Sequence, residues 1–124
     1  MDGGPLRVLI VDDDEGIRET MDDILSLEGY EVDQAGSGMV AIEKCQQQAY
    51  DIILLDIRMP EMNGLETLRE IKKLDPDVRV IMITGFDVGD LARQALEEGA
   101  EALFRKPLDV ATFLPVLLMP PESQ

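Results

Sequence analysis

Apolar residues along the chain gather in five short runs that alternate with longer stretches of helical periodicity. The runs are rich in valine, isoleucine and leucine and have the length of β-strands. Near-continuous apolar strands of this kind are buried on both faces, as in a parallel sheet. The expected strands cover residues 7–11, 30–35, 51–55, 78–83 and 101–105.

The stretches between these runs repeat apolar residues at helical spacing. Gly29 and Gly99 end two of them, as glycine often does just after a helix. In the second helix we expect Val40, Ala41, Ile42 and Cys45 to face inward. The expected helices cover residues 15–28, a segment opening at Ser37-Gly38, residues 65–73, residues 88–98 and a final segment from about Asp109.

Five β–α units in succession predict an α/β fold built on a parallel five-stranded sheet. Right-handed crossovers then place helices on both faces, which makes the sheet doubly wound. Ligands of open parallel sheets bind at the carboxyl ends of the strands. Residues just after each strand are therefore the first candidates for function.

Length and composition fit one globular domain, with 124 residues of which 45% are apolar. No apolar run approaches the roughly 20 residues that span a bilayer. The first residues lack the basic and apolar regions of a signal peptide, so we expect a cytoplasmic location and no membrane contact. Cys45, the one cysteine, is interpreted as a buried structural thiol.

Acidic residues outnumber basic ones by 26 to 11, which gives a net charge of −15. Such a chain repels the phosphates of nucleic acid, so we expect no direct nucleic-acid contact, whereas a cation or a basic partner is attracted. The chain has no histidine, which excludes histidine-based catalysis and histidine–metal sites.

Residues able to carry chemistry follow four of the five expected strands. They are, in order, Asp12-Asp13-Asp14, Asp56, Thr84-Gly85 and Lys106-Pro107. Clustered carboxylates repel one another unless a cation joins them, and Mg²⁺ suits one or two carboxylates with waters and a phosphate. A carboxylate is also a nucleophile that forms an aspartyl phosphate, a reaction that needs mainly positioning and charge neutralisation.

Each of these residues also has an ordinary structural explanation. We interpret Asp14 as a helix N-cap, and capping or solvation explains Asp12 and Asp13, taken singly, as well as function does. Thr84 alone would be a strand-end hydroxyl, and Lys106 alone a solvated lysine. Their coincidence at strand ends favours a functional site.

The order of these motifs resembles the receiver domain of two-component response regulators, a CheY-like family. The resemblance covers about residues 6–118 and implies a flavodoxin-like sheet of strand order 2-1-3-4-5. It also implies a single domain over residues 1–124, with a tail or the start of a linker at 119–124. The matching stretches are VLIVDDDEGIR at 8–18, DIILLDIRMPEMNGLETL at 51–68, VIMITGF at 80–86 and GAEALFRKPLD at 99–109.

The resemblance implies a signalling switch and not an enzyme, with Mg-dependent self-phosphorylation and autodephosphorylation as its only chemistry. Asp56 would accept a phosphoryl group from a sensor histidine kinase or a phosphotransfer protein. Pro107 would follow a cis peptide bond. Mg²⁺, or Mn²⁺ in its place, would be held by Asp12, Asp13, Asp56 and the backbone carbonyl of Arg58, and the phosphoryl group would be met by Thr84, Gly85 and Lys106.

Two features depart from the family. Leu103 stands where much of the family has an aromatic that rotates inward, and strand alternation directs the neighbouring Phe104 to the other face. The resemblance therefore does not carry the usual threonine–aromatic coupling over to this chain. In the expected last helix, Pro115 removes a backbone donor. The apolar segment 113–119 either caps the core or forms a dimer or partner surface with the fourth helix and the fifth strand.

Three other functions fit parts of the pattern. A phosphatase of the haloacid dehalogenase type needs a second aspartate two positions after the nucleophile, where this chain has Arg58. A flavodoxin-like flavin carrier needs a neutral phosphate-binding loop after the first strand, where this chain has three acids. A degenerate receiver that only binds partners stays open because of Leu103.

Overall fold

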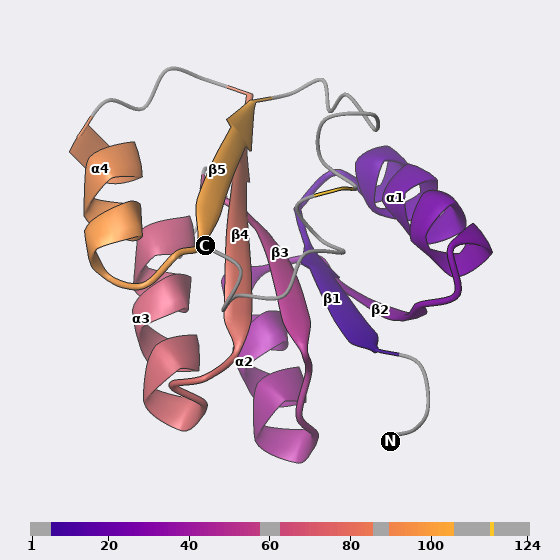
Figure 1. Ribbon diagram of the computed structural model, residues 1–124, viewed down its shortest axis with the longest axis horizontal. Coiled ribbons are helices and arrows are strands. Elements are labelled where there is room, and N and C mark those ends of the chain that lie inside the picture. Colours follow the sequence, from indigo (N-terminus) through magenta and orange to yellow (C-terminus); the bar gives the residue numbers. More distant parts are fainter. Residues whose placement is uncertain (1–5, 58–62, 86–89, 106–114, 116–124) are drawn as a thin grey trace.

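The computed structural model describes residues 6–57, 63–85, 90–105 and 115 of the chain. Over these residues strands and helices alternate, as the sequence predicts (Figure 1). The expected final helix near Asp109 falls outside the described residues. The elements are β1 (Arg7–Val11), α1 (Glu15–Leu27), β2 (Glu31–Ala35), α2 (Gly38–Gln47), β3 (Ile52–Asp56), α3 (Gly64–Leu74), β4 (Arg79–Thr84), α4 (Asp90–Glu97) and β5 (Ala102–Arg105).

The five strands form one parallel sheet in the order β2-β1-β3-β4-β5, which confirms the predicted topology. The chain moves outward from β1 to β2 and then returns past β1 to β3. The reversal of direction lies between β1 and β3, where the crossovers diverge to opposite faces. In a sheet of this kind, the ligand binds outside the carboxyl ends of the two strands that flank this point.

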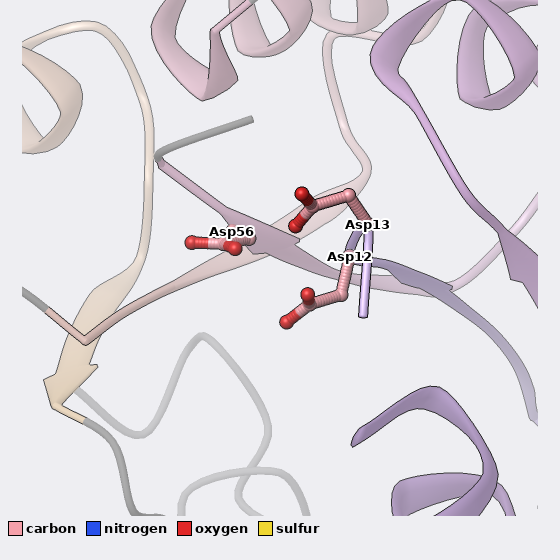
Figure 2. A group of neighbouring side chains, drawn as sticks. All are labelled: Asp12, Asp13 and Asp56. Carbon is pink, nitrogen blue, oxygen red and sulfur yellow. The ribbon is translucent and has the colours of Figure 1, made fainter. Parts of the chain in front are cut away.

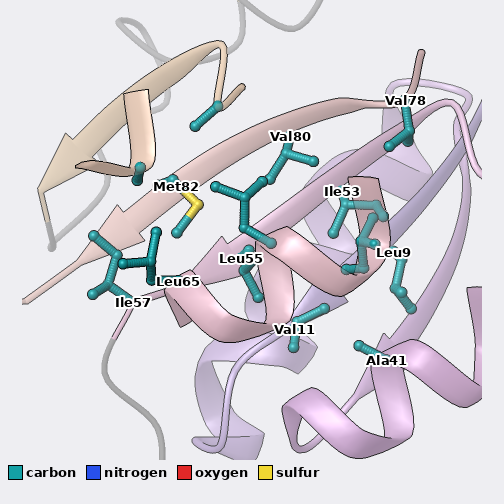
Figure 3. Close-up of a cluster of buried hydrophobic side chains, with 14 of the residues drawn as sticks. Leu9, Val11, Ala41, Ile53, Leu55, Ile57, Leu65, Val78, Val80 and Met82 are labelled. Atoms are coloured by element: carbon teal, nitrogen blue, oxygen red, sulfur yellow. The ribbon is translucent and has the colours of Figure 1, made fainter. Parts of the chain in front are cut away.

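Strand alternation divides the core into two clusters, one on each face of the sheet. Leu9, Ile53 and Val80 point to the face covered by α2, α3 and α4 (Figure 3). Val8, Ile52 and Ile81, each one residue away along its strand, point to the face covered by α1. Because both faces are covered, β3 is buried at every position, which explains its uninterrupted apolar sequence.

One side chain of α2 departs from expectation. Ala41 is fully buried, but Val40 is 37% exposed, so the prediction that Val40 faces inward is wrong. Successive residues of an α-helix differ by about 100° in direction, and the buried stripe of α2 includes Ala41 but ends before Val40. Hydrophobic spacing alone did not locate the edge of the buried stripe.

Candidate functional site

The loop after β1 carries two of the candidate carboxylates. Asp12 is buried, with 3% of its surface exposed, and Asp13 is exposed. The Asp12 backbone N–H donates to the Ala35 carbonyl at 3.1 Å, which extends the β1–β2 pairing past the end of the strand. The Asp14 N–H donates to the Asp12 carboxylate at 2.9 Å. These bonds turn the chain sharply as it enters α1.

Asp56 is the last residue of β3 and is also buried, at 4% exposure. It reaches the same edge of the sheet as Asp12 and Asp13 because β1 and β3 are parallel neighbours in register. One carboxylate oxygen from each of the three residues lies within 4.8 Å of the others (Figure 2). The sequence prediction that these acids converge is therefore confirmed.

This arrangement fits a hard divalent cation. Carboxylate oxygens grouped within 4.8 Å of one another would hold such a cation directly or through bridging water. Carboxylates grouped in this way repel one another, and a cation bound between them would offset that repulsion. Carboxylate oxygens are also the ligand type that Mg²⁺ prefers.

Thr84 and Gly85 lie at the end of the adjacent strand. Asp56 is opposite Ile83 in the β3–β4 register, so Thr84 is one residue further toward the same edge, and it is buried. Gly85 follows as an exposed residue. The remaining sequence candidates, Arg58, Lys106 and Pro107, lie outside the described residues.

The junction between β3 and α3 holds a constraint that sequence reasoning missed. Gly64 is the first residue of α3, and its N–H donates to the Ile57 carbonyl at 2.7 Å. A Cβ atom on Gly64 would lie 2.4 Å from the Asp56 carbonyl oxygen and 2.6 Å from the Ile57 Cα. Only glycine fits this close approach to the backbone behind Asp56, and no local sequence signal reports it.

Three single-residue interpretations are tested by the structure. Asp14 is the N-cap of α1, accepting the Ile17 N–H at 3.2 Å, as expected. Leu103 contacts the cluster beneath α3 and α4, whereas Phe104 contacts the opposite cluster, which confirms the predicted alternation. Cys45 is half-buried against the core, and burial raises the pKa of its thiol to about 11, as suits a structural thiol.

The fold and the acidic cluster define a doubly wound α/β protein of the receiver type, and comparison with known proteins agrees. The sequence matches the response regulator receiver domain family over residues 8–117. The chain therefore belongs to this family, which comprises the phosphoacceptor domains of two-component signalling. Receiver domains typically use Mg²⁺ and interact with histidine kinases or phosphotransfer proteins.

Individual relatives place the chain more closely. It is 36% identical to sporulation initiation phosphotransferase F of Bacillus subtilis over 104 residues, which is 84% of each chain. It is 40% identical to the transcriptional regulatory protein ZraR of Klebsiella oxytoca over 109 residues, which is 88% of this chain but 25% of ZraR. The chain thus spans nearly all of one relative and about a quarter of the other.

Solved structures agree with the fold. A CheY-like receiver domain from Methanospirillum hungatei superimposes with a TM-score of 0.89 at 34% identity, covering 92% of this chain and 91% of that one. The CheX–CheY–BeF₃–Mg²⁺ complex from Borrelia burgdorferi gives a TM-score of 0.87 at 36% identity, covering 94% of this chain and 89% of that one.

Among the residues that the structure describes, no helix is long and apolar enough to cross a membrane.

Proposed function

We propose that Asp56 accepts a phosphoryl group from a sensor histidine kinase or a phosphotransfer protein, and that the modified domain then controls an output domain or partner. The observation that carries this proposal is the group of three carboxylates within 4.8 Å at the switch point of the sheet. Asp56 lies at the centre of the sheet, on a strand buried along its whole length. Such a strand holds the nucleophile in one place for in-line attack.

Within this proposal, four groups at the carboxyl ends of the strands form the cation site. Asp12, Asp13, Asp56 and the backbone carbonyl of Arg58 would hold Mg²⁺, or Mn²⁺ in its place. The bound cation neutralises the charge that the carboxylates and the phosphoryl oxygens bring together. The presence of BeF₃ and Mg²⁺ in the Borrelia CheY complex supports this assignment.

The transfer itself is a displacement at phosphorus. A carboxylate oxygen of Asp56 forms the new O–P bond while the N–P bond of the donor phosphohistidine breaks, and its electron pair returns to the imidazole. Gly85 leaves space for the incoming group, the Thr84 hydroxyl donates a hydrogen bond to a phosphoryl oxygen, and the Lys106 ammonium pairs with the added charge. We further propose that the Lys106–Pro107 peptide bond is cis, as the resemblance to the family implies.

The new charge then shifts a pre-existing equilibrium between two conformations of the domain. Because Leu103 lacks an aromatic ring, the signal passes outward by repacking of the 84–87 loop and α4, without rotation of a ring on β5. A homodimer through α4, β5 and the expected last helix is one output of this change. The domain acts as a signalling phosphoacceptor. The only reactions that it carries out itself are self-phosphorylation and autodephosphorylation.

The proposal extends to the limits and surroundings of the domain. A single receiver domain spans residues 1–124, with its core at about 6–118 and a tail or linker start at 119–124. A cytoplasmic location fits a donor histidine kinase. The net charge of −15 opposes direct contact of this domain with nucleic acid.

The acceptor assignment is tested with acetyl phosphate and Mg²⁺, followed by intact-protein mass spectrometry. We expect the wild-type chain to gain one phosphoryl group, and Asp56→Asn to gain none. Asp51→Asn, at the residue just before β3 and far from the acidic cluster, is the matched control and should be labelled like the wild type. Labelling of Asp56→Asn at the wild-type rate would show that the acceptor is another residue, and no labelling of either protein would support the degenerate receiver.

A further inference from the structure

A cationic side chain on α1 contacts the backbone of the acidic loop. The Arg18 Nη1 donates to the carbonyl oxygen of Asp12 at 2.8 Å. The Arg18 Nε donates to the side-chain oxygen of Gln34, on β2, at 3.1 Å. Arg18 thus spans three elements, and it touches the loop through a peptide group and not through a carboxylate.

The guanidinium of Arg18 is itself held in place. Gln34 donates to the Asp22 carboxylate at 2.8 Å, and the Ser26 hydroxyl donates to the second oxygen of that carboxylate at 2.9 Å. Gly36 lies against the guanidinium, since a Cβ atom at this position would lie 3.3 Å from the Arg18 Nη1. A planar guanidinium fixed along one edge and against a backbone can only present its remaining donors in one direction.

The peptide group that Arg18 binds is the one that joins Asp12 to Asp13. Peptide groups are planar, so the orientation of this carbonyl fixes the positions of the Asp13 amide nitrogen and Cα atom, from which the Asp13 side chain extends. The N–H of Asp12 is bound to Ala35, and its carboxylate accepts the Asp14 N–H. With the Arg18 contact, Asp12 is held at its amide, its carboxylate and its carbonyl.

We infer that Arg18 is a positioning residue for the divalent-cation site, holding the Asp12–Asp13 peptide in the orientation that brings their carboxylates to Asp56. The inference rests on the proposed function of that site. Outer partners that orient metal ligands typically contribute ten- to a hundredfold in affinity. The positive charge of Arg18 acts in the opposite sense, because it repels a cation.

The two effects of Arg18 on Mg²⁺ affinity have opposite signs, so a measurement of affinity distinguishes them. Mg²⁺ affinity is measured by isothermal titration calorimetry on the wild type and Arg18→Met. Loss of positioning predicts binding weaker by about tenfold or more, whereas loss of a nearby positive charge alone predicts tighter binding. Arg93→Met, which removes the same charge from an exposed position on α4, is the control and should leave the affinity unchanged. Affinity of Arg18→Met equal to or tighter than that of the wild type would overturn the inference.

Two further variants separate positioning from a general loss of structure. Gln34→Leu keeps the Arg18 charge but removes its support, and we expect weaker Mg²⁺ binding with thermal unfolding of the metal-free protein little changed. Arg18→Lys keeps the charge and one donor, and should recover part of the affinity. Wild-type affinity in Gln34→Leu would contradict the inference, and these two variants carry the test if Arg18→Met does not fold.

Failure of the site itself gives a different result. If the wild type binds no Mg²⁺, or if Asp13→Asn binds it as well as the wild type does, the cation site is wrongly placed and the proposed function fails with it. If the wild type binds Mg²⁺ and Asp13→Asn does not, the site is sound. The Arg18 variants then decide the positioning role alone.

Discussion

At the scale of single residues, the packing of α3 against the backbone of Asp56 and Ile57 requires that Gly64 has no side chain. The first turn of α3 meets the end of β3 so closely that the Gly64 N–H and the Ile57 carbonyl are bonded at 2.7 Å. Asn63 caps this turn by accepting the Glu66 N–H, while the Glu66 carboxylate accepts the Asn63 N–H. The end of β3 and the first turn of α3 are therefore held in close contact.

We predict that Gly64→Ala destabilises the protein by about 3 kcal/mol, because its new Cβ would overlap the Asp56 carbonyl and the Ile57 Cα. Urea unfolding measures the change. Gly29→Ala is the comparison: Gly29 has a φ of +97° but nothing within 4 Å of a Cβ, so only backbone strain of about 1 kcal/mol is expected. Equal losses in the two variants would show that the close approach at Gly64 is not limiting.

At the scale of elements, β5 is a short strand of four residues at the edge of the sheet. A side-chain pair strengthens its attachment to β4. The Arg79 guanidinium donates to both carboxylate oxygens of Glu101, at 2.7 and 2.9 Å, and the two side chains are only 12% and 15% exposed. Shielding from water makes such a forked pair stronger than the exposed pairs on the helices.

We expect Glu101→Gln to lower the free energy of unfolding by about 1–2 kcal/mol, because it removes a charge-assisted pair from a mostly buried site. The matched control is Glu97→Gln, which breaks an exposed pair with Arg93 and should cost less than about 0.5 kcal/mol. Urea unfolding measures the change in the free energy of unfolding for both variants. A similar small loss in both variants would mean that the Arg79–Glu101 pair does not hold β5.

At the scale of the whole molecule, the sheet concentrates negative charge at the carboxyl ends of its central strands. The protein as a whole already carries a net charge of −15. Asp12 and Asp56 are buried at this edge, so water screens their repulsion less than it screens surface charges. We expect the repulsion among these carboxylates to lower the stability of the metal-free protein. A divalent cation that binds only the folded state reverses this effect by mass action.

We predict that Asp13→Asn raises the thermal unfolding midpoint of the metal-free protein by about 3 °C, since it removes one of three repelling charges. The same variant should lose the stabilisation that Mg²⁺ gives the wild type, which is about 2.7 kcal/mol at a hundred times the dissociation constant. Calorimetric scans with EDTA and with Mg²⁺ at matched ionic strength measure both effects. A lower midpoint for Asp13→Asn in EDTA would show that Asp13 has a structural role instead.

The sequence by itself determined the strand and helix pattern, the doubly wound class and the position of Asp12, Asp13 and Asp56 at strand ends. Strands and helices are local, so side-chain periodicity reports them directly, and parallel pairing then forces those strand ends to one edge. It did not determine which way Val40 faces, because that depends on how α2 lies against its neighbours.

Only the tertiary structure decided how closely the site is assembled. The 4.8 Å grouping of carboxylates, the clash that excludes a Cβ at Gly64, and the Arg18 contact with the Asp12 carbonyl all join different elements. Such contacts are set by strand register and by the packing of helices on the sheet. No local pattern records these quantities, so the sequence identified the acids of the site, while packing placed them and the residues that hold them.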